Sequence, residues 1–405
     1  MAAGRFSVLS VVAAISVVFL FTLSVTLSCS RTASALPTGI WSDPVQISST
    51  SLFRADVDGG AVYAYGWSNM AVSDDGGSTW YPEMPFGGYM DACDGTLYRA
   101  DGSDVPAPGT LVFMKSIDDG TTWASPVAIM QASASDAAWG ISKFDSTIIV
   151  YAFEYAGTSS GLIKSSRSID DGATWSPPVI VDPNVHCEDP LAPSMVYANG
   201  KVYLTYYNYS DDFPAFSDIV VIESPDLGTT WEDRSVVGSG YSPMIAADSG
   251  TVYVSFWGDS GLYIVKSLDG DSWTSQARVG DFIQGTDAQV RHSICASSGV
   301  VVVAYITYDN PGGMNEYWVH LNYSGDMGTT WEDMGNVTGG NGDEKNPNVM
   351  FDGARIHLTW IDTVAGGTFY RSFTFDEPIP EFGAVLLPVI STALLVTGLL
   401  LARKR

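Results

Sequence analysis

Residues 116–123 read Ser-Ile-Asp-Asp-Gly-Thr-Thr-Trp, and this stretch decides the fold because it recurs along the chain. The shared pattern is Ser-x-Asp-x-Gly-x-x-Trp, with five full copies at residues 73–80, 116–123, 168–175, 224–231 and 324–331. A sixth copy at residues 267–273 is one residue shorter, and we call each copy a box. The aspartate and tryptophan of the six boxes are Asp75 and Trp80, Asp118 and Trp123, Asp170 and Trp175, Asp226 and Trp231, Asp269 and Trp273, and Asp326 and Trp331. A regular repeat of this kind predicts an array of similar structural units.

The residue types of the box suit a hairpin turn. The short carboxylate of Asp118 can accept hydrogen bonds from backbone N–H groups of its own turn. Gly120 can adopt the left-handed conformation that such a turn requires. Trp123 re-enters the next strand, where it can pack on a neighbouring unit. We therefore expect the boxes to stabilise turns, since their spacing lacks the ligand pattern of an EF-hand calcium loop.

The segments between boxes have the length and composition of β-strands. Successive boxes begin 43–57 residues apart, which is the length of a four-stranded propeller blade. Residues 194–206 and 243–256 each show a strand, a Gly-bearing turn and a second strand rich in β-branched and aromatic residues. The sequence therefore predicts an all-β protein, a β-propeller of box-bearing blades.

A seventh copy of the front half, residues 346–360, is followed by no box. At the other end of the chain, residues 40–47 match the strand that follows a box at residues 174–180. We therefore expect the N-terminal strand to close the last blade, which removes an open sheet edge. This closure favours seven blades, with six as the alternative.

The box resembles the Asp-box, or BNR repeat, of sialidases and related propellers, and the resemblance covers about residues 40–375. Sialidases usually have six blades. A sialidase-like hydrolase would need three arginines to hold a carboxylate, a tyrosine nucleophile backed by a glutamate, and an acidic proton donor. Residues 53–56, Phe-Arg-Ala-Asp, stand where that family has Phe-Arg-Ile-Pro, so two of the four residues differ. The residues that the resemblance offers for catalysis are Arg54, Arg291, Arg371 and Glu188.

The charge balance excludes one class of partner. Asp plus Glu number 45 against 19 Lys plus Arg, for a formal net charge of −26. Such a field repels nucleic acid, so we expect no nucleic-acid partner.

Both ends of the chain carry apolar segments that predict export and a membrane anchor. Residues 1–35 read as a signal peptide with small residues at Ala33-Ser34-Ala35, although an uncleaved anchor or a lipid-attachment site at Cys29 are alternatives. Residues 383–402 contain no charge and match a transmembrane helix, and the basic tail 403–405 would stay in the cytoplasm. The acidic propeller, residues 36–376, would then lie at the cell surface as the ectodomain of a single-pass membrane protein.

The linker between propeller and predicted span, residues 377–382, contains Pro380-Glu381-Phe382. Together with the span and the basic tail, it resembles the PEF-CTERM sorting signals that archaeosortases process on archaeal surface proteins. The resemblance implies that the span could be exchanged for a lipid anchor.

Acidic residues stand near the predicted start of several innermost strands, where a propeller opens at the mouth of its central axis. We predict that they converge on a site for a divalent cation such as Ca²⁺, a cationic ligand or a sugar. The alternative is that each aspartate only caps its own strand. The candidate ligands are Asp91, Asp136, Asp189 and Asp287, with Ser242 and Asn346 at the matching places of two other blades.

Three functional classes remain open at this point. The preferred one is a cell-surface binding or adhesion module for a glycan, a cation or a surface protein. The alternatives are a sialidase-like glycoside hydrolase and a structural component of the cell envelope, so enzymatic activity stays undecided. Sequons consistent with a secreted surface begin at Asn208, Asn322 and Asn336.

Overall fold

The computed structural model describes residues 36–103, 107–132, 139–155, 160–186, 194–208, 217–281, 292–309, 316–339 and 343–376. The regular structure in these ranges consists of antiparallel β-strands. Within them, no helix has the length and apolar character that crossing a membrane requires. The predicted signal peptide, linker, transmembrane helix and basic tail lie outside the described residues.

The strands form small consecutive sheets, which we number I to VII in chain order. Sheet I contains β3 (Arg54–Asp58), β4 (Ala61–Tyr65), β5 (Asn69–Ser73) and β6 (Met84–Pro85). Sheet II contains β7 (Tyr89–Cys93), β8 (Thr96–Ser103), β9 (Thr110–Ser116) and β10 (Val127–Gln131). Sheet III contains β11 (Trp139–Phe144), β12 (Thr147–Tyr155), β13 (Ser160–Ser168) and β14 (Val179–His186).

Sheets IV and V share one long strand, β18 (Glu232–Asp248), whose first half pairs with β17 and whose second half pairs with β19. Sheet IV contains β15 (Ser194–Ala198), β16 (Lys201–Asn208), β17 (Ser217–Ser224) and the first half of β18. Sheet V contains the second half of β18, β19 (Thr251–Trp257), β20 (Gly261–Ser267) and β21 (Ala277–Asp281).

Sheet VI contains β22 (His292–Ser297), β23 (Val300–Asp309), β24 (Glu316–Ser324) and β25 (Glu332–Asn336). Sheet VII contains β26 (Glu344–Phe351), β27 (Arg355–Asp362) and β28 (Gly367–Phe375), together with the N-terminal strands β1 (Gly39–Trp41) and β2 (Val45–Ser48).

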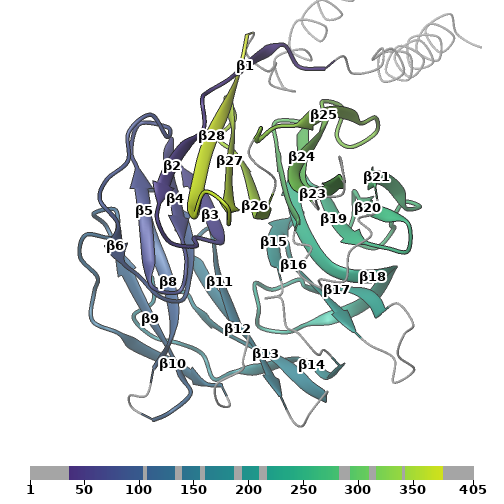
Figure 1. Ribbon diagram of the computed structural model, residues 1–405. Coiled ribbons are helices and arrows are strands. Elements are labelled where there is room, and N and C mark those ends of the chain that lie inside the picture. Colours follow the sequence, from purple (N-terminus) through teal and green to yellow (C-terminus); the bar gives the residue numbers. More distant parts are fainter. Residues whose placement is uncertain are drawn as a thin grey trace, which may run out of the picture.

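The sheets are arranged in a propeller-like ring (Figure 1). The first strand of each sheet contacts the first strand of the next, in the order β3, β7, β11, β15, β18, β22, β26, and β26 returns to contact β3. The second strand of each sheet is covered on both faces by neighbouring sheets. All seven residues of β19 are buried, for example, and five of them are apolar or aromatic. The core therefore lies between the sheets, in a circle around the axis.

The N-terminal strands complete sheet VII, as predicted. Trp41 of β1 pairs with Phe373 of β28, and the two rings lie 5.2 Å apart between centroids. Val45 of β2 pairs with Tyr370 of the same strand. The last sheet thus receives its outer strand from the opposite end of the chain, and this pairing closes the ring without an interlocking helix or disulfide among the described residues.

The ring has two distinct faces, which the direction of the strands defines. In each sheet the first strand runs toward a hairpin turn, and the third strand runs back toward the same end, where the box follows in sheets I to VI. We call this end the box face. We call the opposite end, where the first strands begin, the mouth face.

The boxes form the hydrogen bonds that their sequence predicts. In residues 116–123, Asp118 Oδ1 accepts the hydroxyl of Ser116 (2.7 Å) and the N–H of Thr122 (2.9 Å). The N–H of Gly120, whose φ is 83°, donates to Ser116 Oγ at 2.9 Å. The short box keeps the same principle, because Asp269 Oδ1 accepts the N–H groups of Asp271 and Ser272.

Each box also contacts the preceding sheet. Trp80 packs edge-on against Tyr370 at 5.0 Å, and Trp175 lies 5.4 Å from Phe113. The box glycines approach side chains of the preceding sheet so closely that no Cβ would fit in most of them; the pairs are Gly77 with Tyr370, Gly120 with Met70, Gly172 with Phe113, Gly228 with Ile149, Gly270 with Tyr203 and Gly328 with Tyr253. The boxes therefore fasten neighbouring sheets as well as closing turns, as the sequence predicted for their tryptophans.

The later boxes repeat this contact with different partners. The indole N–H of Trp231 donates to Ser165 Oγ in sheet III at 2.9 Å. Trp331 packs against the buried cluster that contains Tyr253 of sheet V, while its indole N–H has no hydrogen-bond partner among the described residues. The indole N–H groups of Trp80 and Trp273 donate instead to the backbone oxygens of Gly77 and Gly270 in their own boxes. The contact with the preceding sheet thus depends mainly on the ring of the tryptophan.

The prediction for the box tryptophans was wrong in one respect, because they do not re-enter the next strand. Five of them lie before that strand begins and outside regular structure, and the sixth forms only an isolated bridge to Ser267. All six are half-buried, since the indole lies over the end of the preceding sheet, where solvent reaches part of the ring. The five that precede their strands are Trp80, Trp123, Trp175, Trp231 and Trp331, and the bridged one is Trp273.

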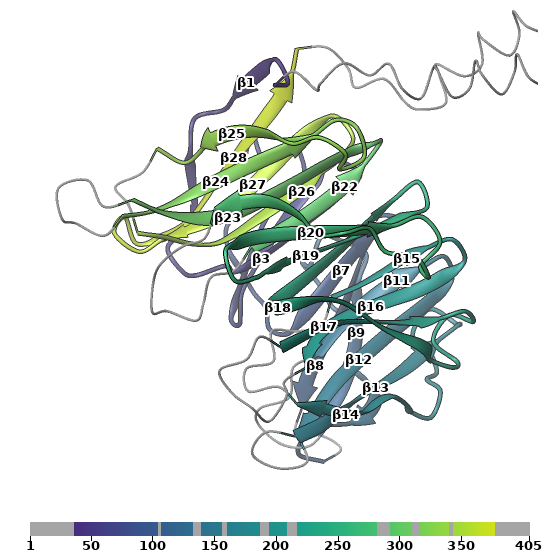
Figure 2. The same ribbon diagram turned by 90° about the vertical axis from the view of Figure 1, so that its right-hand side faces the viewer.

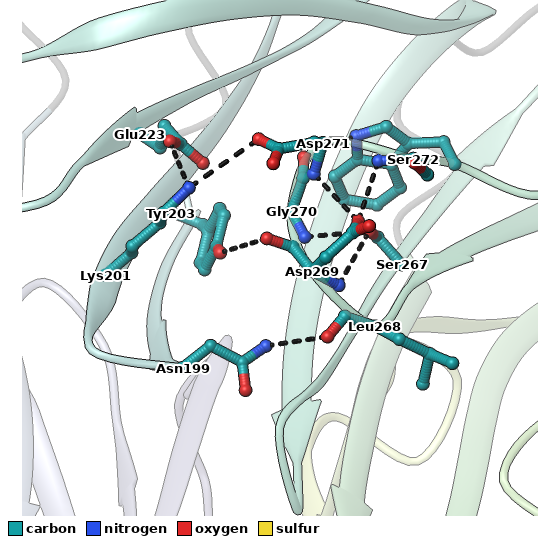
Figure 3. A network of polar contacts seen from close by, with 11 residues as sticks. Asn199, Lys201, Tyr203, Glu223, Ser267, Leu268, Asp269, Gly270, Asp271 and Ser272 are labelled. Carbon is teal, nitrogen blue, oxygen red and sulfur yellow. Dashed lines mark hydrogen bonds and ion pairs between the residues drawn. The ribbon is translucent and has the colours of Figure 1, made fainter.

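The contact between sheets IV and V shows this fastening in detail (Figure 3). Asn199 donates from Nδ2 to the backbone oxygen of Leu268 at 3.1 Å. Lys201 binds the buried carboxylate of Glu223 at 2.6 Å and lies 3.6 Å from Asp271 of the short box. Burial raises the pKa of Glu223, while the hydrogen bond from Lys201 opposes that rise. The ion pair thus offsets part of the free-energy cost of burying the charged carboxylate of Glu223 between the sheets.

Candidate functional site

The mouth face of sheets I to III holds an arginine that has no carboxylate partner among the described residues. Arg54 is the first residue of β3, and its guanidinium lies over the ring of Tyr89 with 4.4 Å between Cζ and the ring centroid. Tyr89 is the first residue of β7, so the two side chains meet where neighbouring first strands begin. The contact is a cation–π stack, in which the ring holds the plane of the guanidinium.

Arg54 keeps its positive charge in this position. Burial acts to lower its pKa, but the nearby hydroxyls of Tyr89, Tyr65 and Tyr151 more than offset this, so the pKa lies above the ordinary arginine value. Within the described part of the chain, Arg54 forms no ion pair, and its buried Nε has no hydrogen-bond partner. A half-buried guanidinium that has no carboxylate partner among the described residues is a favourable place for an anion.

Aromatic side chains extend from Arg54 across three sheets. The rings of Phe53 and Trp67 lie 5.1 Å apart, those of Trp67 and Tyr89 lie 5.7 Å apart, and those of Tyr89 and Trp139 lie 5.7 Å apart. Trp67 sits on the turn between β4 and β5 and remains 60% exposed. A large exposed indole next to an unpaired guanidinium indicates a binding surface, since Trp, Tyr and Arg dominate binding energies at such surfaces.

Two aspartates lie further along the first strands, and each accepts a hydrogen bond from a backbone N–H group of the following sheet. Asp56 Oδ2 accepts the N–H of Ala92 in β7 at 2.8 Å. Asp91 Oδ2 accepts the N–H of Lys143 in β11 at 2.7 Å. Each carboxylate therefore fastens its own first strand to the first strand of the following sheet.

This environment shifts both carboxyl groups toward the protonated form. Burial raises the pKa of Asp56 to about 6, against the hydrogen bonds from Ala92 and Val57. Burial, followed by the charge of Asp56, raises the pKa of Asp91 well above its usual range. Near neutral pH the pair therefore carries less than its full negative charge.

The predicted acidic cluster is only partly placed by the structure. Asp91 lies three residues before its hairpin turn, whereas Ser242 and Asn346 lie further from theirs, at irregularities of β18 and β26 where φ is 52° and 49°. Asp91 is thus not equivalent to those two positions, and it does not cap its own strand turn. Within the described ranges, no group of three or more His, Cys, Asp or Glu side chains could hold a metal ion. Asp136, Asp189 and Asp287 lie outside those ranges, so the cation site stays a prediction.

The arginines suggested by the sialidase resemblance do not all meet. Arg371 stacks on Trp41 at 4.8 Å and donates to the backbone oxygens of Ser42 (2.8 Å) and Val337. Its guanidinium therefore fastens β28 to the N-terminal strands and to sheet VI, away from the mouth. The neighbouring Tyr370 points to the opposite side of β28, where its hydroxyl donates to the backbone oxygen of Gly76. Arg291 and Glu188 lie outside the described residues.

Asp56 lies two residues after Arg54 but accepts hydrogen bonds from backbone N–H groups and forms no ion pair with it. One further expectation needs correction. The sequon at Asn322 is unsuitable for a glycan in this fold, because its side chain is only 9% exposed and donates to the backbone oxygen of Val279. Asn336 is exposed, and Asn208 is half-buried and accepts the N–H of His186.

Sequence reasoning found Arg54 but missed the aromatic residues around it. The sequence carried one usable signal, because Trp67-Ser68-Asn69 forms a short polar turn in which a tryptophan would otherwise be out of place. The proximity of Tyr89 and Trp139 has no such signal, since it follows from the placement of three separate sheets.

The comparisons with known proteins concern the fold. No protein-family model matches the sequence. No curated protein matches it either. A protein of unknown function from Dyadobacter fermentans is 17% identical over 82% of this chain and 98% of its own, with a TM-score of 0.48.

Two other solved structures are similar at the same level. The sialidase of Trypanosoma rangeli in complex with sialic acid is 14% identical over 80% of this chain and 60% of its own, with a TM-score of 0.48. YCF48 bound to D1 peptide is 13% identical over 85% of this chain and 98% of its own, with a TM-score of 0.49. Likeness at these identities assigns no activity to this chain.

Proposed function

We propose that this protein is a cell-surface binding module, a seven-bladed propeller whose mouth binds a glycan through a carboxylate of its sugar. The observation that carries the proposal is the guanidinium of Arg54, stacked on Tyr89 and without a carboxylate partner among the described residues. In a chain of net charge −26, a cation left unpaired at the mouth is unusual and favours an anionic group.

The neighbouring rings fit the rest of a sugar. A pyranose presents an apolar face of C–H groups, which can lie against the exposed ring of Trp67 and the half-buried ring of Trp139, while its hydroxyls stay hydrated. A carboxylate on the same sugar would accept from the guanidinium edge of Arg54. The combination supports an acidic monosaccharide unit over a neutral one.

The experiment is a calorimetric titration of the full chain in detergent with glucuronic acid, galacturonic acid and sialic acid, and with glucose as the neutral control. Arg54→Ala removes a charged hydrogen bond, so we expect the dissociation constant of the acidic sugar to rise about 10- to 100-fold. Arg355→Ala makes the same change of charge on the box face and should leave binding unchanged. Equal affinity for glucose and the acidic sugars, or an unchanged affinity in Arg54→Ala, would contradict the proposal.

Hydrolysis is the competing function at the same place. Burial raises the pKa of Asp91, which is the direction that an acid catalyst needs, although the described mouth supplies one arginine where the resemblance requires three. A fluorogenic glycoside panel that includes a sialoside distinguishes the two functions. Turnover that Arg54→Ala abolishes would make the protein an enzyme, whereas binding without turnover supports the binding module.

We also propose that residues 383–402 anchor the propeller outside the cell. Resistance to carbonate extraction in the full chain, and its loss in a chain that ends at Asp376, is the expected result. Mass measurement of the mature protein tests the sorting signal, since cleavage near Pro380-Glu381-Phe382 would remove the apolar span. Calcium titration of the same preparation tests the cation site proposed for Asp91, Asp136, Asp189 and Asp287.

A further inference from the structure

The box face carries exposed aliphatic side chains at one repeated position. The second residue of the box is Ile117 in sheet II, Ile169 in sheet III and Leu268 in sheet V, and these are 79%, 68% and 70% exposed. Sheet IV has the exposed Pro225 at the same place. Four consecutive sheets therefore present apolar tips on one face.

The geometry of the turn does not require these residues. Sheets I and VI carry Asp74 and Gly325 at the same position, and their boxes make the same hydrogen bonds. Figure 3 shows the side chain of Leu268 turned away from the network that its own backbone joins. The aliphatic tips thus contribute nothing evident to the box, and their exposure calls for another surface.

Both described ends of the chain lie at this same face. The N–H of Asp376 donates to Thr38 at 2.9 Å, and Phe375 pairs with Gly39. The hairpin turn at residues 352–354 precedes Arg355, which pairs with Thr374, so the end of β28 lies beside a turn of the box face. The described ends at β1 and β28 are side by side in both views (Figure 1, Figure 2).

The sequence after Asp376 places a membrane close to this face. Six residues, 377–382, separate Asp376 from the uncharged stretch 383–402. Even fully extended, six residues span only about 20 Å. If the stretch is the anchor proposed above, a six-residue linker attaches the box face of the propeller to the membrane. The mouth with Arg54 then points away from the bilayer.

From the exposed aliphatic side chains and the short linker together, we propose that the box face is a lipid-contacting surface. Ile117, Ile169 and Leu268 enter the boundary between headgroups and acyl chains, as exposed aliphatic residues of membrane-bound proteins do. The flanking carboxylates of the boxes, such as Asp118 and Asp170, are exposed and stay at headgroup level. Because these carboxylates repel like charge, the surface fits neutral headgroups and disfavours anionic ones.

The experiment uses the full chain in phosphatidylcholine vesicles, with a benzophenone amino acid at position 117, 169 or 268. Irradiation then attaches radiolabelled lipid to any position that reaches the acyl boundary. The matched control is position 364, because Val364 is an aliphatic residue that is 61% exposed on a turn of the mouth face. We expect lipid attachment about tenfold greater at the three box positions than at position 364, since interfacial side chains reach only about 5–10 Å into the membrane.

The outcomes separate this proposal from the binding function. Equal labelling at all four positions, strongest labelling at position 364, or a chain that does not float with vesicles would each overturn it. Replacing part of the phosphatidylcholine with phosphatidylglycerol should lower labelling at the box positions, and an increase would contradict the charge argument. Binding of acidic sugars at Arg54 does not depend on any of these results.

Discussion

At the scale of single residues, the protein uses carboxyl groups for two opposite purposes. The box aspartates accept several hydrogen bonds near solvent, and these hold the pKa of Asp170 at about 2. Asp56 and Asp91 accept few hydrogen bonds in the interior, where burial raises their pKa values. The same side chain thus has a lowered pKa as a turn acceptor in one place and a raised pKa as a buried contact between strands in the other.

The two raised pKa values predict how stability depends on pH. A carboxyl group whose pKa is higher in the folded state stabilises the fold fully below its unfolded pKa of about 4 and loses this contribution as pH rises. For Asp56 this contribution to the free energy of unfolding is lost between about pH 4 and pH 6. For Asp91 the loss extends to higher pH. Thermal melts across this range should therefore show the melting temperature falling as pH rises.

The matched variants test that assignment. The double change Asp56→Asn and Asp91→Asn keeps the acceptors for Ala92 and Lys143 but removes the titrating groups, so the fall should disappear. Asp58→Asn, which alters a carboxylate bound to the N–H of Gly95 at the box face, should retain it. An unchanged pH profile in the double variant would show that other groups cause the fall.

At the scale of elements, the box couples one sheet to the next through glycines that have no room for a side chain. A Cβ on Gly172 would lie 1.9 Å from the ring of Phe113 in sheet II, and φ there is +83°. Gly200 has a similar φ of +79°, but nothing lies within 4 Å of its Cβ position. Comparing the two glycines therefore separates the cost of the left-handed backbone conformation from the cost of crowding between two sheets.

This difference gives a quantitative prediction for alanine substitution. Gly200→Ala should cost only the left-handed conformation, about 1–2 kcal/mol of unfolding free energy. Gly172→Ala should add overpacking against Phe113, for a total of about 3–5 kcal/mol. Urea unfolding of both variants measures the difference, and equal losses would mean that the box does not fasten sheet III to sheet II.

At the scale of the whole molecule, stability depends on closing the ring. Sheet VII takes its outer strands from residues 39–48, and Arg371 binds them through Ser42. Without these strands, β28 becomes an exposed sheet edge and the ring loses the stacking of Trp41 on Phe373.

We expect a chain beginning at Ser49 after the same leader to lose about 3–5 kcal/mol, comparable to deletion of a buried aromatic, and to aggregate. A chain beginning at Gly39 keeps both strands and serves as the control. Size-exclusion chromatography and thermal melts measure the outcome. Equal behaviour of the two chains would mean that the ring does not need its N-terminal strands.

The sequence by itself determined the repeated unit, the all-β class, the turn chemistry of the boxes and the pairing of residues 40–47 with the last sheet. The first three depend on local patterns, because a turn needs particular residues at particular spacings. The pairing of residues 40–47 followed from their match to the strand after a box. Arg54 was also visible, through its place in the resemblance to sialidases.

Only the tertiary structure decided which side chains meet at the mouth. Phe53, Trp67, Tyr89 and Trp139 come from three sheets, so their proximity depends on how the sheets pack around the axis rather than on any local pattern. The same packing left the box tryptophans half-buried before their strands and showed that Arg371 fastens the closing strands. A residue's type and spacing predict what it can do, but its partners are decided by contacts between elements that are distant in sequence.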